Sequence, residues 1–504
     1  MPEYVRALAY VLVLAFPALV VAKKMAVPLI DEDEFRRWRN CWIIVTCAAF
    51  FSSSFVAFSA MILLMSVYIH CCAKHPIYFY IIVMSAAPCV SVGLGIPGIF
   101  NSIIELNPPK LLALLILVPV ATTLWKDPKN RRISFLDISI VSLYVLLSAL
   151  SLRYGVTSVL RASLGYFLVI LVPYFALSRG LQTARDVDRA LLAVAVAALP
   201  PAVIGVFEMW KGWRLYNQVM QQWDVFLVAP YLYRDGLLRA STTSVEPIAF
   251  GFLCMAGAGC LLTLRKVPKF STWHYVGLAI LLLGLLSSLS RGPWLGFALF
   301  ASLSLAAQPR TAVKLLVWAI PFLAGAVHFS PGGFSRFVNL LPFVGSSDPG
   351  SEIYRSQLFT NAMIVIERYP LFGSLTFLQE PEMLRMIQGQ GIIDVVNSYL
   401  QIALEFGLVG LFLFLTFFVA LAASLFVQAA KSKVEPSPLN HAGLLAILLA
   451  VLVTIATTSS VSVIPHIYWA FAGICAALPR LRKDIDQEPP VRAQSQMRVL
   501  NPFG

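Results

Sequence analysis

Residues 401–429 read QIALEFGLVGLFLFLTFFVALAASLFVQA and contain a single charged residue, Glu405. A block of about 20 apolar residues is enough to span the hydrocarbon core of a bilayer as a helix. Because lipid offers no hydrogen-bond partner to backbone amides, this block predicts a membrane-spanning helix.

The composition of the whole chain extends this prediction beyond one segment. Of the 504 residues, 59% are hydrophobic and 12% are charged, and the mean hydropathy is +0.79. Soluble domains carry roughly 25% charged residues, so this chain has too little polar surface to cover a globule. We predict an all-α, polytopic membrane protein.

Further apolar blocks place the other helices after residue 75. They predict helices near 76–92, 109–125, 136–151, 162–177, 190–209, 247–264, 273–289, 293–308, 312–328, 442–459 and 464–479. Lys and Arg collect in cytoplasmic loops, and here they mark one set of connections: Lys126 to Arg132, Arg265 to Lys269, Arg310 with Lys314, and Lys431 with Lys433. Arg480, Arg482 and Lys483 then place the C-terminus in the cytoplasm.

The N-terminal part, 1–75, has a less certain topology. Residues 6–22 lack a convincing cleavage site, and Lys23-Lys24 and another apolar block follow them, so we expect a retained helix rather than a signal peptide. Residues 41–69 are long for one crossing and short for two. The predicted total is therefore 13 to 15 crossings, about 14.

This orientation leaves two long loops on the periplasmic side of a 76–483 membrane domain. They are 211–246 and 329–400. Apolar residues within 352–369 recur at helical spacing, which predicts a helix inside the second loop, ended by Pro370 and Gly373. We expect the tail, 484–504, to be disordered and cytoplasmic.

Several function classes are disfavoured by the same sequence. The net charge of +13 is the bias expected of cytoplasmic loops, and we infer no nucleic-acid partner. Neither the eight cysteines nor the six histidines show metal-ligand spacing, so we predict no metal. No nucleotide-binding motif is present, and no cofactor is implied.

The segment 238–247 enters a helix through hydroxyl residues, an acid and a proline. Helix capping explains Ser244, Glu246 and Pro247. It does not require Arg239, which we consider a candidate ligand together with Glu246.

Arg291 and Arg355 are two more candidates. Arg291 lies in the tight turn 287–294, at the predicted outer boundary, where an arginine must either snorkel or bind an anion. Arg355 lies on the predicted loop helix, where a solvated side chain is the simpler explanation.

The segment 391–400 supplies Asp394, Asn397 and Tyr399. Asp394 and Asn397 are three residues apart and share a face if the segment is helical. They could equally cap the helix that follows.

These residue types together suit sugar transfer from a polyprenyl diphosphate. Arginine binds phosphate through a planar fork of donors that keeps its charge. Several arginines would hold a diphosphate and stabilise it as a leaving group. A nearby carboxylate could accept a proton from an acceptor hydroxyl.

At these positions the chain resembles the O-antigen ligase and Wzy polymerase superfamily. The strongest similarity runs from Tyr354 to Leu411 and includes Arg368-Tyr369-Pro370-Leu371-Phe372-Gly373, Asn397-Ser398-Tyr399-Leu400 and Glu405-Phe406-Gly407-Leu408-Val409-Gly410. The turn 289–294, the segment 239–251 and Pro97-Gly98, Leu106-Asn107 and Lys110-Leu111-Leu112 are similar as well.

The resemblance implies a fold related to GT-C transferases and metal-independent transfer at the periplasmic face of the bacterial inner membrane. It implies an undecaprenyl-diphosphate-linked oligosaccharide as donor, membrane lipids as surroundings and other polysaccharide assembly and export proteins as possible partners. The family's diphosphate-binding arginines would correspond to Arg239, Arg291 and Arg355.

One position departs from the ligase pattern. Ligases have a histidine directly before the asparagine, and this chain has Val396, which cannot accept a proton. Asp394 is the nearest replacement and Glu246 the second choice, a pattern closer to exopolysaccharide polymerases. The expected function is polymerisation of lipid-linked repeat units; a ligase, a flippase and an inactive scaffold are the alternatives.

Overall fold

The computed structural model describes residues 2–96, 100–225, 232–234, 236–264, 271–306, 349–388, 391–432 and 439–481. Several predictions fall outside these residues: the helix 312–328, the start of the loop 329–400, the tail 484–504, and Pro97-Gly98. Some of the Lys and Arg residues that mark the predicted cytoplasmic connections and C-terminus also lie outside the described residues: Arg265 to Lys269, Arg310, Lys314, Lys433, Arg482 and Lys483.

Helices dominate the described chain, and seven of those described are long and apolar enough to cross a membrane. They are Glu3–Ala26 (α1), Phe55–Cys72 (α3), Pro108–Lys126 (α5 to α6), Phe135–Tyr154, Val156–Gly180, Ala184–Lys211 (α10) and Ser398–Lys431 (α19). Within Phe135–Tyr154, α7 is Phe135–Leu150 and a 3₁₀ turn follows; Val156–Gly180 contains Val156–Tyr166 (α8) and Val172–Gly180 (α9). Shorter apolar helices are Pro247–Thr263 (α12), Thr272–Ser287 (α13), Arg291–Ala306 (α14), His441–Ala456 (α20) and Ile464–Ala477 (α21). The protein is therefore an all-α polytopic membrane protein, and the total of about 14 crossings stays a prediction.

Residues 41–69 divide between two helices. The first is Glu32–Phe51 (α2), and α3 begins at Phe55 after a short turn. Ser54 caps α3 by accepting a hydrogen bond from the amide of Ala57 at 3.3 Å.

The helix expected over 76–92 is wrong in its second half. It ends at Val83 (Pro76–Val83, α4), and residues 92–106 form an antiparallel hairpin of Val92–Ile96 (β1) and Phe100–Leu106 (β2). Pro88 explains the early end, because proline lacks an amide hydrogen and disfavours helix in the residue before it. A second, smaller hairpin pairs Tyr233–Arg234 (β3) with Leu237–Leu238 (β4).

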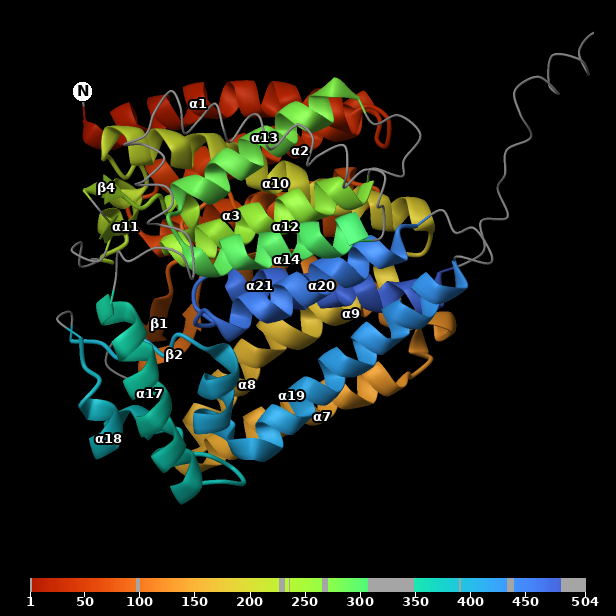
Figure 1. The fold of residues 1–504 in the computed structure, drawn as a ribbon. Coiled ribbons are helices and arrows are strands. Elements are labelled where there is room, and N and C mark those ends of the chain that lie inside the picture. The colour runs from red at the N-terminus through yellow and green to blue at the C-terminus, as the bar shows by residue number, and fades with distance from the viewer. Residues whose placement is uncertain are drawn as a thin grey trace, which may run out of the picture.

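The helix α10 lies at the centre of one group of helices and packs against α1, α4, α12 and α13 (Figure 1). It is the most deeply buried of the long apolar helices, with 83% of its apolar window buried. Small residues allow this packing: a Cβ on Gly284 of α13 would lie 2.7 Å from the Cβ of Ala202, and one on Gly257 of α12 would lie 2.8 Å from that of Ala198.

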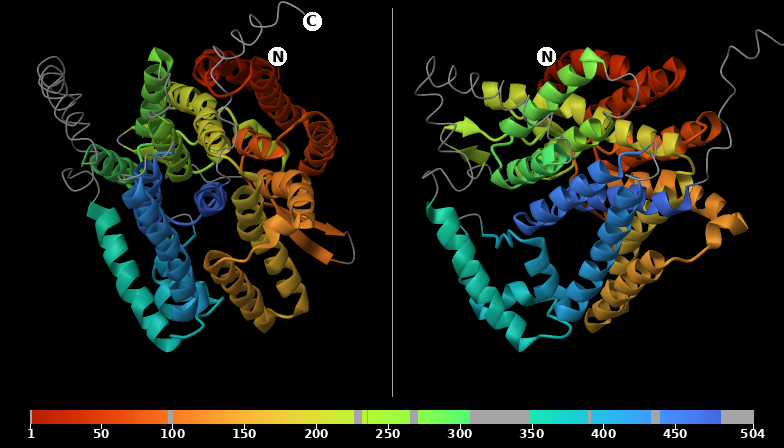
Figure 2. Two further views of the ribbon diagram at one scale, coloured as in Figure 1. Left: turned by 90° about the vertical axis from the view of Figure 1, so that its right-hand side faces the viewer. Right: turned by 45° about the vertical axis from the view of Figure 1, so that its right-hand side comes forward.

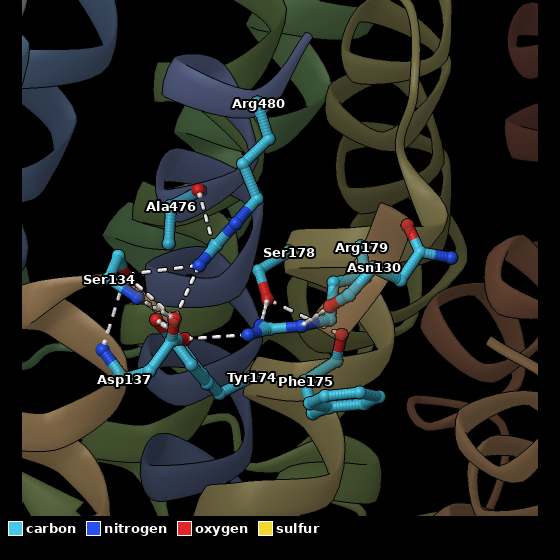
Figure 3. Close-up of polar contacts among 9 residues, drawn as sticks. All are labelled: Asn130, Ser134, Asp137, Tyr174, Phe175, Ser178, Arg179, Ala476 and Arg480. Carbon is cyan, nitrogen blue, oxygen red and sulfur yellow. Dashed lines mark hydrogen bonds and ion pairs between the residues drawn. The ribbon is translucent and has the colours of Figure 1, made fainter. Parts of the chain in front are cut away.

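A second group, formed by α7, α8, α9, α19 and α21, lies beside the first (Figure 2). An ionic cluster ties three of its elements together around Asp137 at the start of α7 (Figure 3). Its carboxylate accepts from Arg179 of α9 at 2.9 Å, from Arg480 just beyond α21 at 2.5 Å, and from the Tyr174 hydroxyl at 2.8 Å. The Arg179 side chain is only 4% exposed, so this pair is removed from water.

The described part of the second loop forms a small lobe. It contains Pro349–Arg368 (α17), a 3₁₀ turn at Phe377–Gln379 and Pro381–Leu384 (α18). The predicted loop helix is α17, with Pro370 and Gly373 just beyond its end. The lobe has its own apolar core, centred on Leu358, Ala362, Val365, Met383 and Val395.

We predict that Asp137→Ala destabilises the protein by about 3–5 kcal/mol, because it leaves Arg179 buried without its carboxylate. Thermal unfolding of the detergent-solubilised protein measures the change. The matched control is Asp33→Ala, which removes the exposed partner of Arg36 at 3.5 Å and should cost less than about 1 kcal/mol. Equal effects of the two substitutions would contradict a structural role for the cluster.

Candidate functional site

The connection between α20 and α21 is rich in hydroxyl groups and contacts three other segments. Ser459 donates to the Asp394 carboxylate, and Ser398 donates to the carbonyl of Thr458 at 2.8 Å. Ser462 donates to the carbonyl of Ser244 at 2.5 Å. Segments from both predicted periplasmic loops therefore meet on this connection.

The first loop also docks on the turn between α13 and α14. Arg239 donates from Nη2 to the Ser290 hydroxyl at 3.0 Å, and Arg234 donates to the carbonyl of Leu289 at 2.7 Å. The amide of Ala240 donates to the carbonyl of Ser287 at 3.0 Å. Arg239 is thus fixed beside the turn that carries Arg291.

Arg291 is half-buried at the start of α14. The next residue, Gly292, packs against the α20–α21 connection, since a Cβ there would lie 2.7 Å from the Thr457 hydroxyl and 2.8 Å from Thr458. We call the set of segments 239–246, 287–292, 394–398 and 457–462 the loop junction. Arg239, Glu246, Arg291, Asp394 and Asn397 all belong to it.

Arg355 lies at the edge of the loop junction. It is exposed on α17, and the hydroxyl of its neighbour Tyr354 donates to the backbone carbonyl of Asp394 at 3.0 Å. The lobe therefore carries Arg355, and its Tyr354 contacts the backbone of Asp394.

Backbone strain is concentrated in the loop junction. Of the five described non-glycine residues with positive φ, four lie there: Thr242, Val245, Leu289 and Ser462. Val245 is β-branched and has φ of 68°, a conformation that such residues rarely adopt. Strain of this kind gathers at functional sites, where the surrounding structure holds it.

Two of the predicted site residues also have structural contacts. Asn397 caps α19 by accepting from the amides of Tyr399 and Leu400 at 2.9 and 3.1 Å. The Tyr399 hydroxyl donates to the carbonyl of Leu452 on α20 at 2.9 Å. The cap position of α12 is Glu246 rather than Ser244, and the Glu246 side chain forms no capping hydrogen bond.

Glu208 is a residue of this region that the sequence interpretation missed. It lies near the end of α10 and is 1% exposed. Its carboxylate accepts from the amides of Leu215, Ser241 and Thr242 at 3.0, 3.2 and 2.9 Å. An acid in a predicted membrane helix was the available signal, as was the run of hydroxyl residues from Thr457 to Ser462.

A backbone contact between two glycines, outside the loop junction, holds the turn after α17 against α19. Gly407 interrupts α19 with φ 70° and ψ −173°, and Gly373 has φ 61°. The amide of Leu408 donates to the carbonyl of Pro370 at 2.8 Å, and that of Ser374 to Leu404 at 2.8 Å. A Cβ on Gly407 would lie 2.3 Å from the Leu371 carbonyl oxygen, so both glycines are needed for the contact.

The site can therefore present guanidinium groups, hydroxyls and the carboxylates of Glu246 and Asp394 to a ligand. In the described part of the chain no cluster of three His, Cys, Asp or Glu side chains could hold a metal ion. Guanidinium and hydroxyl donors suit a phosphate or diphosphate.

Comparison with known proteins adds an independent finding. Residues 276–415 match the family model described as O-antigen ligase, which confirms the resemblance expected from the sequence. The match includes Arg291, Arg355, Asp394, Asn397 and Tyr399, and it excludes Arg239 and Glu246. No curated protein matches the chain significantly.

We predict that Gly407→Ala lowers the thermal stability of the protein, because alanine would need a glycine-only conformation and would collide with Leu371. The loss should exceed about 2 kcal/mol. Gly165→Ala on α8 is the matched control, since a Cβ there meets nothing within 4 Å and alanine favours helix. Unchanged unfolding of Gly407→Ala would refute the role of this contact.

Proposed function

We propose, from the premise that residues 276–415 form an O-antigen ligase-type region, that the protein is a glycan polymerase. It transfers undecaprenyl-diphosphate-linked oligosaccharide repeat units onto a growing exopolysaccharide or O-antigen chain. The reaction takes place at the periplasmic face of the inner membrane, with the C-terminus in the cytoplasm. The observation that carries the proposal is the loop junction, where the segments that carry Arg239, Arg291 and Asp394 contact one another through Ser290, Gly292 and the α20–α21 connection.

The arginines bind the donor diphosphate. Arg239 is oriented by Ser290, and Arg291 begins a helix that packs on the α20–α21 connection. Arg355 approaches from the lobe. Fixed guanidinium groups stabilise negative charge that develops on a departing diphosphate, so the transfer needs no metal ion.

Asp394 is the proposed base. It is half-buried, and its carboxylate accepts from Ser459, which orients it while leaving further acceptor capacity for an acceptor hydroxyl. Glu246, at the cap of α12, is the second candidate. Asn397 and Tyr399 shape the site by fixing the start of α19.

Val396 favours a polymerase over a ligase, because its side chain cannot act as the histidine of ligases does. A ligase-type transfer to another acceptor remains the near alternative. A flippase would need substrate groups near the bilayer midplane, within broken helices and repeated halves. The candidate groups instead gather at one end of the helices, which favours an enzyme.

We predict that Arg291→Ala or Arg355→Ala reduces polymer synthesis by about 10²–10³-fold, as expected for loss of one transition-state donor. The test complements a deletion strain with each variant, checks the membrane level and measures polymer chain length. Asp394→Asn tests the base. Arg132→Ala is the control, because Arg132 is exposed and lies in a predicted cytoplasmic connection.

The supporting result is single lipid-linked repeat units on the periplasmic side of cells that make Arg291→Ala at normal levels. Normal polymer in both arginine variants would refute the mechanism. Repeat units trapped on the cytoplasmic side of the deletion strain would indicate a flippase instead.

A further inference from the structure

A groove of about 430 Å³ lies between α1 and α2, away from the loop junction. Its walls are mostly apolar, and Lys23, Arg39 and Asn40 supply its polar groups; the apolar residues are Leu12, Ala15, Phe16, Leu19, Val20, Phe35 and Ile43. The volume is in the range of small-molecule sites, roughly 300–1,000 Å³.

The polar part of the groove is at the opposite end of α10 from the loop junction. Arg189, near the start of α10, donates to the carbonyl of Leu29 in the turn between α1 and α2 at 3.1 Å. Glu208, near the other end of α10, accepts a hydrogen bond from the amide of Thr242 in the loop junction. Because α10 has 28 residues, about 42 Å separates its two ends. The groove therefore faces the cytoplasmic leaflet in the predicted orientation.

The charges in the groove suit an anion. Arg39 donates from Nε and Nη2 to the Asn40 side chain at 3.1 and 2.9 Å, and among the described residues it has no carboxylate partner. Lys23 is paired with Glu32 at 2.5 Å. An arginine beside apolar walls is costly in a membrane unless it reaches water or an anion.

The surroundings of the groove are apolar and exposed. Phe16 is 68% exposed and Ile44, one residue beyond Ile43, is 51% exposed. Such side chains face hydrocarbon in a membrane protein. A ligand with both an acyl chain and a negative headgroup would fill the groove better than a soluble anion.

We propose that this groove binds an anionic phospholipid of the cytoplasmic leaflet. Its acyl chain lies along Leu12, Phe16, Val20 and Ile43, and its phosphate accepts hydrogen bonds from Arg39; Lys23, which pairs with Glu32, lies at the same end of the groove. The site does not depend on the proposed function, because it shares no residue with the loop junction.

Native mass spectrometry of the detergent-solubilised full-length protein, titrated with phosphatidylglycerol or phosphatidylcholine, tests the site. The wild type should bind phosphatidylglycerol at least tenfold more tightly than it binds phosphatidylcholine. Arg39→Gln should lose about tenfold in this affinity, the effect of removing one charged hydrogen bond. Arg36→Gln is the matched control on the same helix, since Arg36 pairs with Asp33 outside the groove.

A second variant tests the apolar wall. Val20→Trp should weaken both lipids, because the larger side chain occupies the space of the acyl chain. Equal binding of the two lipids by the wild type, or unchanged phosphatidylglycerol binding by Arg39→Gln, would overturn the proposal. Displacement of the lipid by millimolar inorganic phosphate would indicate a soluble-anion site and overturn it as well.

Discussion

The loop junction depends on the hydrogen bonds that the buried carboxylate of Glu208 accepts from the backbone. Three backbone amides of the first predicted periplasmic loop donate to it. Buried amides without an acceptor would each cost about 1–3 kcal/mol, so Glu208 determines the path of the chain just after Arg239. That path includes the strained residues Thr242 and Val245, whose conformations persist because the carboxylate and the α20–α21 connection hold both sides of the loop.

The second loop is held by a different interaction, farther along α19 from the loop junction. The backbone contact between Gly373 and Gly407 fixes the lobe on the first turns of α19. The two motifs that carry the family resemblance in this region, Pro370 to Gly373 and Glu405 to Gly410, are therefore the two sides of one contact. Both loops then meet on the hydroxyl residues between α20 and α21, so the site depends on two independently positioned backbone segments.

The sequence predicted helices well where apolar blocks were long, because the bilayer requires a helix of a given length. The described apolar helices from α5 to α21 lie close to their predicted ranges, whereas the short helices Asn217–Gln222 (α11) and α18 were not predicted. The exception is 76–92, which was misjudged because Pro88 interrupts a run that is otherwise apolar and therefore looks like one helix. Residues 41–69 could not be divided because the turn at Ser52 to Ser54 breaks the apolar run only briefly.

Site residues could be proposed one at a time, but hydrophobicity does not encode which loops touch. Glu208 could have been flagged as an acid within a predicted membrane helix, but its role could not be predicted, because its partners are backbone amides and these leave no pattern in the sequence.

The separate core of the lobe has a mechanistic consequence. Leu358, Val365, Met383 and Val395 pack together with Leu404 of α19, apart from the main core. Asp394 is bonded to this lobe through Tyr354 and to the helices through Ser459. Arg355 therefore belongs to the lobe as one unit, Arg239 and Arg291 belong to the main core as the other, and Asp394 is bonded to both. In the proposed mechanism, a diphosphate held by arginines from both units bridges them. It then lies at a defined position relative to Asp394, which Ser459 already orients, before the acceptor hydroxyl is deprotonated.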